Sequence, residues 1–278
     1  KGKSANYACL PMDTEVLTDK GLKHFDDLKV GDIVYSYKDG NIVEDVIKYK
    51  HFYKDAEVVH YGDSKKTLRS TANHRWLTQK RIWNNDLRRN SKTLTNPYFT
   101  NTEDLNSHSM VLTTAPYLGG SSLVTPDEAA LIAWILSDGS FDGSVTIAQS
   151  LNKFYADVEG LINRLGLQHS KYVSERDNGN HVNVYTCFKC DVKPIFEKAG
   201  LRMTKNQDFS NFLLSLNRES LEAFVDAFYK ADGCVLDTRS YSINQNEGFL
   251  SDAVRLALFL IGDGRVKVEG YKKCKTIR

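Results

Sequence analysis

Two aspartates have the clearest chemical potential in this chain, because each ends an apolar, helix-like segment and is followed by glycine. Asp138 ends the segment that begins at Ala129, and Asp232 ends the segment that begins at Leu221. Two carboxylates held close together must share a proton or bind a cation, and hard oxygen ligands of this kind suit Mg²⁺. Such a site fits hydrolysis of a phosphodiester by metal-activated water. The simpler alternative is that each Asp-Gly pair only ends a helix.

A second group of residues could support acyl transfer. Cys9 lies in a strand-like segment, and the segment Thr71-Ala-Asn-His74 lies in another β pattern that ends at Thr78. A cysteine thiol with a histidine helper is sound nucleophilic chemistry. The alternative is an ordinary buried cysteine in a strand.

A duplicated unit must position the two aspartates. The first copy starts at Thr125-Pro-Asp-Glu128, with a threonine N-cap, proline at the first helical position and acids in the first turn. Downstream, the chain repeats itself at a constant offset: 145–149 matches 241–245, 154–165 matches 250–261, and Gly166 matches Gly262. The pattern predicts helix, strands, helix, strands in each copy.

The two aspartate-bearing helices are expected to pack on each other. Both are apolar nearly all round, which is typical of helices buried on most faces. The small residues Ala133 and Ala227 occupy matching positions and would allow a close approach. Packing around a pseudo-twofold axis would then bring Asp138 and Asp232 together.

The first 120 residues read as an all-β segment. Short strand patterns at 15–18, 32–37 and 57–61 are separated by turn signals at Asp19-Lys-Gly21 and Lys38-Asp-Gly40. A faint repeat relates 24–36 to 101–113: each has a polar turn, an Asp-Leu pair and then a strand. Two unrelated turn-and-strand pieces are the alternative. A Gly/Ser stretch at 118–122 is the expected junction between the halves.

Composition sets only broad limits on function. The 278 residues are 41% hydrophobic and 26% charged, which is ordinary for a globular protein. No apolar run has the length of a membrane span, and the first eight residues lack a signal-peptide core, so a cytoplasmic protein of a microbial or viral host cell is expected. A net charge of +2 is too mild to indicate nucleic-acid binding by itself.

The five cysteines do not form a disulfide framework, because their number is odd and they are sparse. Cys187 and Cys190 make a lone Cys-x-x-Cys. A structural zinc would need two further ligands, and ordinary thiols on a strand and turn are the alternative.

The duplicated segments resemble the paired motifs of LAGLIDADG homing endonucleases, from about Pro126 onward. Leu131 to Gly139 and Val225 to Gly233 keep that family's small third residue and acidic eighth residue, although the other letters differ. The resemblance implies that Asp138 and Asp232 bind Mg²⁺ and the scissile phosphates. It also implies that Gln149 and Gln245 position solvent and that Lys205 contacts the active-site water network, although the proline that often follows this lysine is missing.

The same resemblance implies saddle-shaped sheets that bind a long, asymmetric double-stranded DNA site, with the chain acting as a monomer. Arg, Asn and Gln side chains read base edges, whereas Lys mostly meets phosphate. A solvated polar strand face is the alternative for each residue. The expected DNA-binding residues are Lys171, Arg176, Asn178, Asn180, His181, Asn183, Tyr185, Arg239, Tyr241, Lys267 and Lys272.

The first half resembles the N-terminal splicing region of an intein, whose β fold is the Hint domain. The resemblance rests on Cys9 and on Thr71 and His74. It implies that Cys9 attacks the preceding carbonyl to form a thioester, that His74 assists cleavage of the peptide bond, and that Thr71 holds it. Residues 1–8 would then be flank of the host protein, which is the partner in cis.

The expected fold class is therefore α+β. An all-β Hint-type domain, 9–120, precedes a pseudo-twofold LAGLIDADG domain, 121–278, made of two αββαββα-like repeats at about 125–215 and 216–278. The second repeat is expected to be incomplete in this sequence, with the C-terminal splicing segment lying elsewhere. The expected function is a site-specific endonuclease joined to a splicing domain; a catalytically degenerate DNA-binding or splicing-only intein is the alternative.

Overall fold

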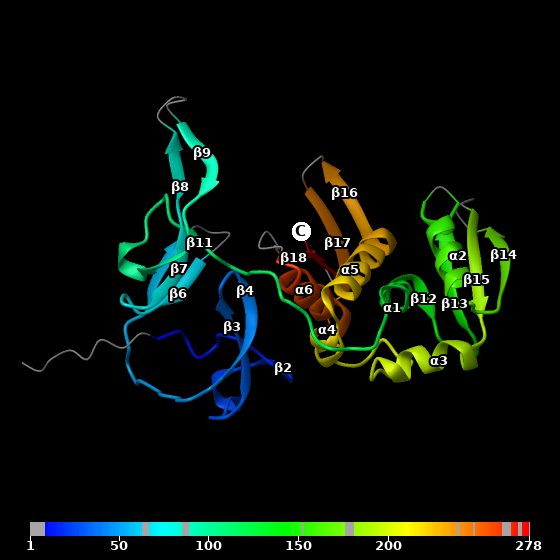
Figure 1. Cartoon of the computed structure of the whole chain (residues 1–278), viewed down its shortest axis with the longest axis horizontal. Helices are drawn as coiled ribbons and strands as arrows, with labels where there is room; N and C mark the ends of the chain where they lie inside the picture. The colour runs from blue at the N-terminus through cyan, green and yellow to red at the C-terminus, as the bar shows by residue number, and fades with distance from the viewer. Residues whose placement is uncertain are drawn as a thin grey trace, which may run out of the picture. The chain divides into compact units, whose positions relative to one another are not determined.

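The computed structural model describes residues 9–62, 67–84, 89–151, 153–175, 181–237, 240–246, 248–262, 268–271 and 274–277. The chain divides into two compact units. The first contains Leu22–Ser36 and Glu44–Thr114 with the N-terminal residues up to Thr18, and the second contains Asp19–Gly21, Tyr37–Val43 and Ala115–Arg278 (Figure 1). Among the described residues, no helix is long and apolar enough to cross a membrane.

The described residues up to Thr114 form small antiparallel sheets and two 3-10 turns, without an α-helix. This agrees with the all-β pattern, but the sheets have only two to four strands, so the Hint-type fold stays an expectation. The strand orders are β2-β1-β3-β4, β5-β6, β10-β7-β11 and β8-β9. The strands are β1 Val16–Thr18, β2 Gly21–Lys23, β3 Ile33–Lys38, β4 Asn41–Val46, β5 Val59–Gly62, β6 Thr67–Ser70, β7 Arg75–Gln79, β8 Arg81–Asn84, β9 Arg89–Leu94, β10 Tyr98–Asn101 and β11 Met110–Val111.

The turn between β3 and β4 follows from its two residues. Asp39 and Gly40 both have positive φ, 49° and 88°. Two consecutive left-handed residues form the turn whose twist matches a two-residue hairpin, and Asp-Gly is a favoured pair there. The turn predicted at Lys38-Asp-Gly40 is therefore a hairpin with this geometry.

The faint repeat of the first half has the same local structure in both copies. Phe25–Asp27 (η1) and Thr102–Asp104 (η2) are 3-10 turns, and each is followed by an extended, buried leucine. The amides of Leu28 and Leu105 donate to the carbonyls of Phe25 and Thr102, both at 3.2 Å. The shared Asp-Leu pattern thus encodes one turn that places an apolar side chain in the interior.

The second unit contains two repeats with the same order of helices and strands. The first consists of α1 Pro126–Asp138, β12 Gly139–Ser140, β13 Val145–Ser150, α2 Tyr155–Arg164, β14 His169–Glu175 and β15 His181–Cys187. Two further helices, α3 Lys189–Lys198 and α4 Ser210–Ser215, lead to the second repeat. That repeat consists of α5 Arg218–Asp232, β16 Gly233–Asp237, β17 Ser240–Asn246, α6 Phe249–Leu260, β18 Val268–Tyr271 and β19 Cys274–Ile277.

The two sheets have equivalent strand orders, β12-β13-β15-β14 and β16-β17-β19-β18. Their registers also correspond, because Gly139 pairs with Ile147 and Gly233 pairs with Ile243. The glycines after the second helix of each repeat match as well: Gly166 and Gly262 have φ of 65° and 87° and follow the C-caps of α2 and α6. The duplication read from the sequence is therefore a duplication of structure.

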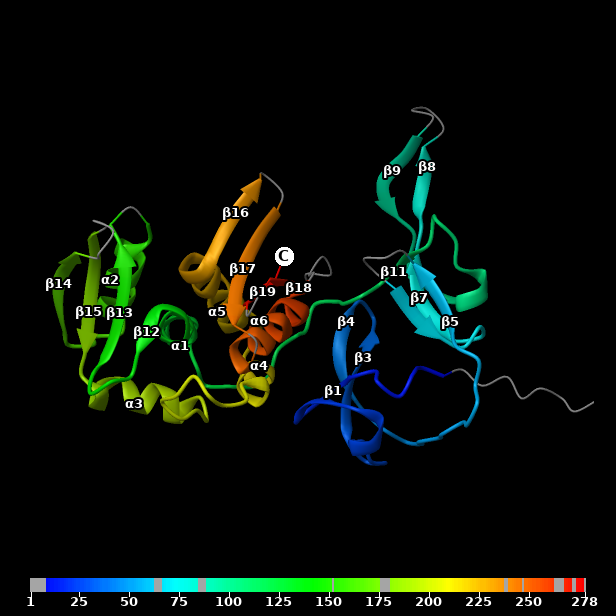
Figure 2. The same cartoon turned by 180° about the vertical axis from the view of Figure 1, so that it is seen from behind.

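Helices α1 and α5 pack on each other, as the repeat predicts. The two views show them side by side, each next to the sheet of its own repeat (Figure 1, Figure 2). The small residues Ala133 and Ala227 are both buried. Thr125 caps α1 in a full capping box with Glu128, which satisfies two helix-end amides.

The two helices differ in their outer faces. Seven residues of α1 are buried, six of them consecutive from Leu131 to Leu136. Helix α5 is instead amphipathic, and it exposes Glu222 and Asp226. The expectation that both helices are apolar nearly all round holds for α1 and is wrong for α5, whose polar stripe faces solvent.

Candidate functional site

Asp138 and Asp232 are the last residues of α1 and α5, and a strand starts immediately after each. The following glycine makes this sharp change of direction possible. A Cβ on Gly139 would collide with the carbonyl oxygen of Ile135, and one on Gly233 would collide with that of Tyr229. Both Asp-Gly pairs therefore fix a carboxylate at the junction of a helix and a strand.

A glutamine from the second strand of each repeat holds each carboxylate. Gln149 Nε2 donates to Asp138 Oδ2 at 2.5 Å, and Gln245 Nε2 donates to Asp232 Oδ2. Each glutamine lies two residues beyond the isoleucine that pairs with the glycine after the aspartate. The side chains at i and i+2 share one face of a strand, so both glutamines reach back to the end of the helix in the same way.

Lys205 joins the two carboxylates into one site. It lies between α3 and α4, and its Nζ donates to the carbonyl of Ser137 at 2.8 Å. Burial lowers the pKa of this ammonium, while the negative charges of Asp232 and Asp138 oppose that shift. An interaction with both carboxylates means that one lysine sits within reach of both repeats.

The charges that act on Asp232 also come from more than one part of the second unit. Burial raises the pKa of this carboxyl, while Lys205, the hydrogen bond from Gln245 and Lys153 lower it. Lys153 belongs to the other repeat and was not among the site residues expected from the sequence. The position of Lys153 four residues after Gln149 was the available signal.

A cavity of about 710 Å³ opens beside Asp232. Strand β17, the segment around Lys205 and the start of α6 contribute to its wall. Its lining is Ser137, Lys205, Asn206, Asp232, Asn244, Gln245, Asn246, Gly248, Phe249, Leu250 and Asp252. Ser137, next to Asp138, and Asp232 thus border one space.

The residues expected to bind DNA have varied surroundings in the described part of the first sheet. Tyr185 is fully buried and donates to the carbonyl of Tyr155 and to Glu159, and Asn183 is also buried. Lys171 forms an ion pair with Glu159 at 2.8 Å. The structure therefore places Tyr185 and Asn183 in the interior. Lys171 is exposed, and its ammonium pairs with Glu159 of α2.

His181, by contrast, is exposed at the start of β15. Of Tyr241 the structure describes the backbone alone, as part of β17. The remaining expected DNA-binding residues lie outside the described residues: Arg176, Asn178, Asn180, Arg239, Lys267 and Lys272.

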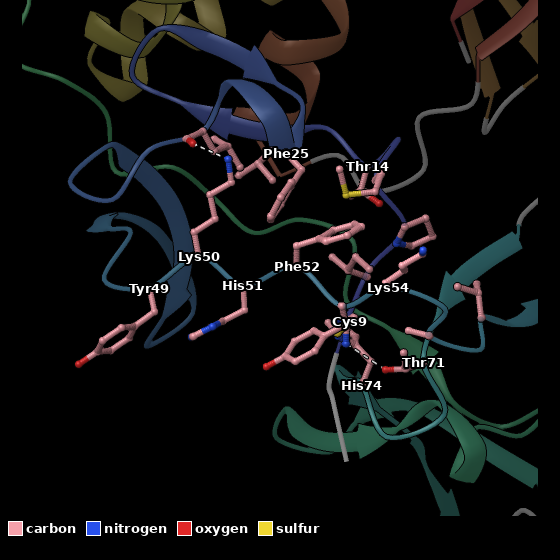
Figure 3. Close-up of a pocket in the computed structure, with 18 of the residues that line it drawn as sticks. Cys9, Thr14, Phe25, Tyr49, Lys50, His51, Phe52, Lys54, Thr71 and His74 are labelled. Carbon is pink, nitrogen blue, oxygen red and sulfur yellow. Dashed lines mark hydrogen bonds between the residues drawn. The ribbon is translucent and has the colours of Figure 1, made fainter. Parts of the chain in front are cut away.

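Cys9, Thr71 and His74 come together in the first unit, as Figure 3 shows. The Cys9 amide donates to Thr71 Oγ1 at 2.9 Å, and the Thr71 amide donates to the Cys9 carbonyl at 3.0 Å. The His74 amide donates to the Thr71 carbonyl at 3.0 Å. Thr71 thus links the backbone of the thiol residue to that of the histidine.

The surroundings of His74 disfavour the charged form of its ring. Its ring lies 4.8 Å from that of Trp76, edge to face, and Trp76 Nε1 donates to Thr102. Burial lowers the pKa of His74, and nearby Arg75 lowers it further. His74 Nδ1 is buried and has no hydrogen-bond partner among the described residues.

The same three residues border a cavity of about 850 Å³ (Figure 3). Its wall includes Phe25, Phe52 and the segment from Tyr49 to Ala56. Burial raises the pKa of the Cys9 thiol, so the sulfur is held as a thiol and would need a proton acceptor before it reacts.

The described residues include no group of three His, Cys, Asp or Glu side chains that is placed to hold a metal ion. Among the described residues, the cysteines at 9, 187, 190 and 234 are not joined in disulfides. Cys187 is buried and Cys190 exposed, so the Cys-x-x-Cys pair has the character of ordinary thiols at a strand end and a helix start.

No family model matches the chain, and no curated protein sequence matches it. Solved structures resemble part of it. The N-terminal LAGLIDADG domain of DUF199/WhiA has a TM-score of 0.40 and 11% identity, covering 55% of this chain and 75% of its own. A complex of I-DmoI with DNA and Mn has a TM-score of 0.38 and 18% identity, covering 56% and 90%. The homing endonuclease I-WcaI bound to its DNA recognition sequence has a TM-score of 0.39 and 15% identity, covering 56% and 76%.

Proposed function

We propose that the second unit is a LAGLIDADG-type endonuclease that cuts both strands of DNA at a specific site. The observation that carries the proposal is the matched pair of carboxylates. Asp138 and Asp232 end equivalent helices, an equivalent glutamine holds each one, and Lys205 interacts with both. A duplex offers two scissile phosphates on two strands, and two equivalent carboxylates match that need.

The donor set fits Mg²⁺. This ion is usually bound by one or two carboxylates together with substrate phosphates and water, rather than by a complete protein cage. Asp138 and Asp232 would hold it, and the phosphate oxygens of DNA would provide further ligands. When bound, the ion would polarise a phosphoryl oxygen and lower the pKa of a water molecule.

The other residues have supporting roles. Gln149 and Gln245 orient the carboxylates through one oxygen each. The ammonium of Lys205, which the Ser137 carbonyl holds, would attract the phosphate and counter the charge that develops on it during hydrolysis.

The target is double-stranded DNA with a long, asymmetric sequence, because the two repeats carry different side chains. One chain contributes both repeats, so the active form is a monomer. Homing into a copy of the host gene that lacks the insert is the biological role that follows from this activity.

A cleavage assay tests the proposal. The full chain is incubated with Mg²⁺ and a plasmid that carries the host gene without the insert, and linear product is measured. We expect linearisation by the natural chain, with no product from Asp138→Asn or Asp232→Asn. Wild-type rates in both variants would refute the two-carboxylate mechanism. Specific, salt-sensitive binding without any cut strand would favour a degenerate DNA-binding module instead.

A second function is favoured by a separate observation, the linkage of Cys9, Thr71 and His74. We propose that the first unit performs the first step of intein splicing. The Cys9 sulfur would attack the carbonyl carbon of Ala8, the Ala8–Cys9 carbon–nitrogen bond would break, and a thioester would form. The thiol proton would reach the leaving amine with the help of His74, whose buried Nδ1 lacks a partner among the described residues.

Thiol-induced release of the first eight residues tests this step. We expect dithiothreitol to release them from the full chain and expect Cys9→Ala to abolish release. Thr71→Ala should slow it, because Thr71 Oγ1 accepts the hydrogen bond from the Cys9 amide. Equal release from Cys9→Ala would contradict the thioester.

A further inference from the structure

The second strand of each repeat, β13 and β17, turns one face toward the helices and the other away from them. In β13 the burial alternates: Val145, Ile147 and Gln149 are buried, and the three residues between and after them are half-buried. Because successive side chains of a strand point to opposite faces, the outer face of β13 carries Thr146, Ala148 and Ser150.

The outer face of β17 follows from the same reasoning. Ile243 borders a small cavity with α5 and α6 residues such as Phe228 and Val254, and Gln245 reaches Asp232. The alternate positions, Ser242, Asn244 and Asn246, therefore lie on the opposite face, where Ser242 is buried and the two asparagines are exposed.

Equivalent positions on the two outer faces have different chemistry. The register pairs Gly139 with Ile147 and Gly233 with Ile243. Asn244 thus corresponds to Ala148, and Asn246 corresponds to Ser150. Both asparagines are exposed. The second repeat presents two carboxamides where the first presents a methyl group and a hydroxyl.

The two asparagines also lie beside the candidate catalytic site. Both line the 710 Å³ cavity together with Asp232, Gln245 and Lys205. A duplex with a phosphate at Asp232 would bring neighbouring base edges to this strand. A carboxamide has a donor and an acceptor that match adenine N7 and N6 in the major groove, whereas alanine has neither group.

We propose that the two halves of the DNA site are read unequally: Asn244 and Asn246 read base edges next to the cut in one half, and the equivalent positions of the other half contribute little. This inference rests on the proposed endonuclease function. Adenine is the expected base opposite at least one of the two asparagines. The unequal reading gives the protein one direction on its target.

A panel of duplexes tests the proposal, with every single base-pair substitution in the central part of the target. Competition binding and cleavage are measured separately for each duplex. We expect the natural chain to discriminate by about tenfold or more at positions within one half. Asn244→Ala and Asn246→Ala should reduce this to about twofold, since one bidentate contact is lost in each.

Matched variants in the first repeat provide the control and a gain-of-function test. Ser150→Ala should leave the profile unchanged. Ala148→Asn combined with Ser150→Asn should create new discrimination in the other half. Thermal unfolding and binding to nonspecific DNA identify any variant that fails to fold.

The outcomes separate the inference from the function on which it rests. An unchanged profile in both asparagine variants overturns the inference, and so does an equal loss in Ser150→Ala, even where cleavage persists. Absence of any sequence-specific binding or cleavage by the natural chain overturns the endonuclease function, and the inference with it.

Discussion

Replacing Gln245 with methionine removes the amide that holds Asp232 while keeping the length of the side chain. Gln245 Nε2 donates to Asp232 Oδ2, and a hydrogen bond to a charged group contributes about 1.5–3 kcal/mol. Asp232 is only partly buried, so solvent screening favours the lower end of that range. Since about 1.4 kcal/mol is tenfold in an equilibrium constant, Gln245→Met should need about ten times more Mg²⁺ for half-maximal cleavage.

The pH dependence of the same variant has a definite sign. Burial already raises the pKa of Asp232, and the hydrogen bond from Gln245 lowers it. Without the amide the carboxyl is protonated more readily, and a protonated carboxyl binds Mg²⁺ poorly. The defect should therefore be largest at low pH and shrink as the pH rises.

The assay is DNA cleavage titrated with Mg²⁺ at several pH values. Gln79→Met is the matched control, because the Gln79 amide donates to the Thr95 carbonyl at 3.0 Å in the first unit. It should leave the Mg²⁺ requirement unchanged. A wild-type Mg²⁺ requirement in Gln245→Met would refute the role given to the amide. So would a loss that neither higher Mg²⁺ nor higher pH restores.

Three further outcomes are expected. Because burial raises the pKa of Asp232, its ionisation at neutral pH opposes folding. Asp232→Asn should therefore abolish cleavage and raise Tm at pH 7, by about 2–4 °C per kcal/mol gained. A lower Tm in this variant would contradict the reasoning. Burial lowers the pKa of His74 below 6.5, so the natural chain should lose stability to urea as the pH falls through and below that value, and His74→Gln should lose less. Burial raises the pKa of the Cys187 thiol to about 11. At pH 8, iodoacetamide should therefore alkylate Cys190 and spare Cys187 until urea is added. Mass spectrometry of the modified chain measures this.

The features that sequence alone predicted well are local signals that occur twice. Thr125 caps its helix as its sequence context indicates. The constant offset of the repeat predicted that Gln149 and Gln245 are equivalent, and each glutamine reaches the aspartate of its own repeat. A duplicated pattern constrains three-dimensional position, since two copies of one fold must place equivalent residues alike.

The sequence did not show which face of each strand points toward the helices. Alternation shows which residues of a strand share a face, but it does not show which face meets a helix. Tyr185 has a polar tip and looked suited to DNA, yet its ring is buried and its hydroxyl bonds Tyr155 and Glu159. Lys171 pairs with the same glutamate. These contacts come from α2, whose placement depends on packing rather than on local sequence.

The ion pair of Lys230 has a consequence for how the two repeats recognise each other. Lys230, on α5, contacts Asp157 of α2 at 2.9 Å across the boundary between repeats. The equivalent positions on the other side are Leu136 and Ala253, which are both buried. Two copies of the first repeat would set a leucine against Asp157, and two copies of the second would bury Lys230 against an alanine. If the halves were produced as separate polypeptides, we expect this contact to favour the mixed pair over either homodimer, by no more than about 1 kcal/mol because the ion pair is partly exposed.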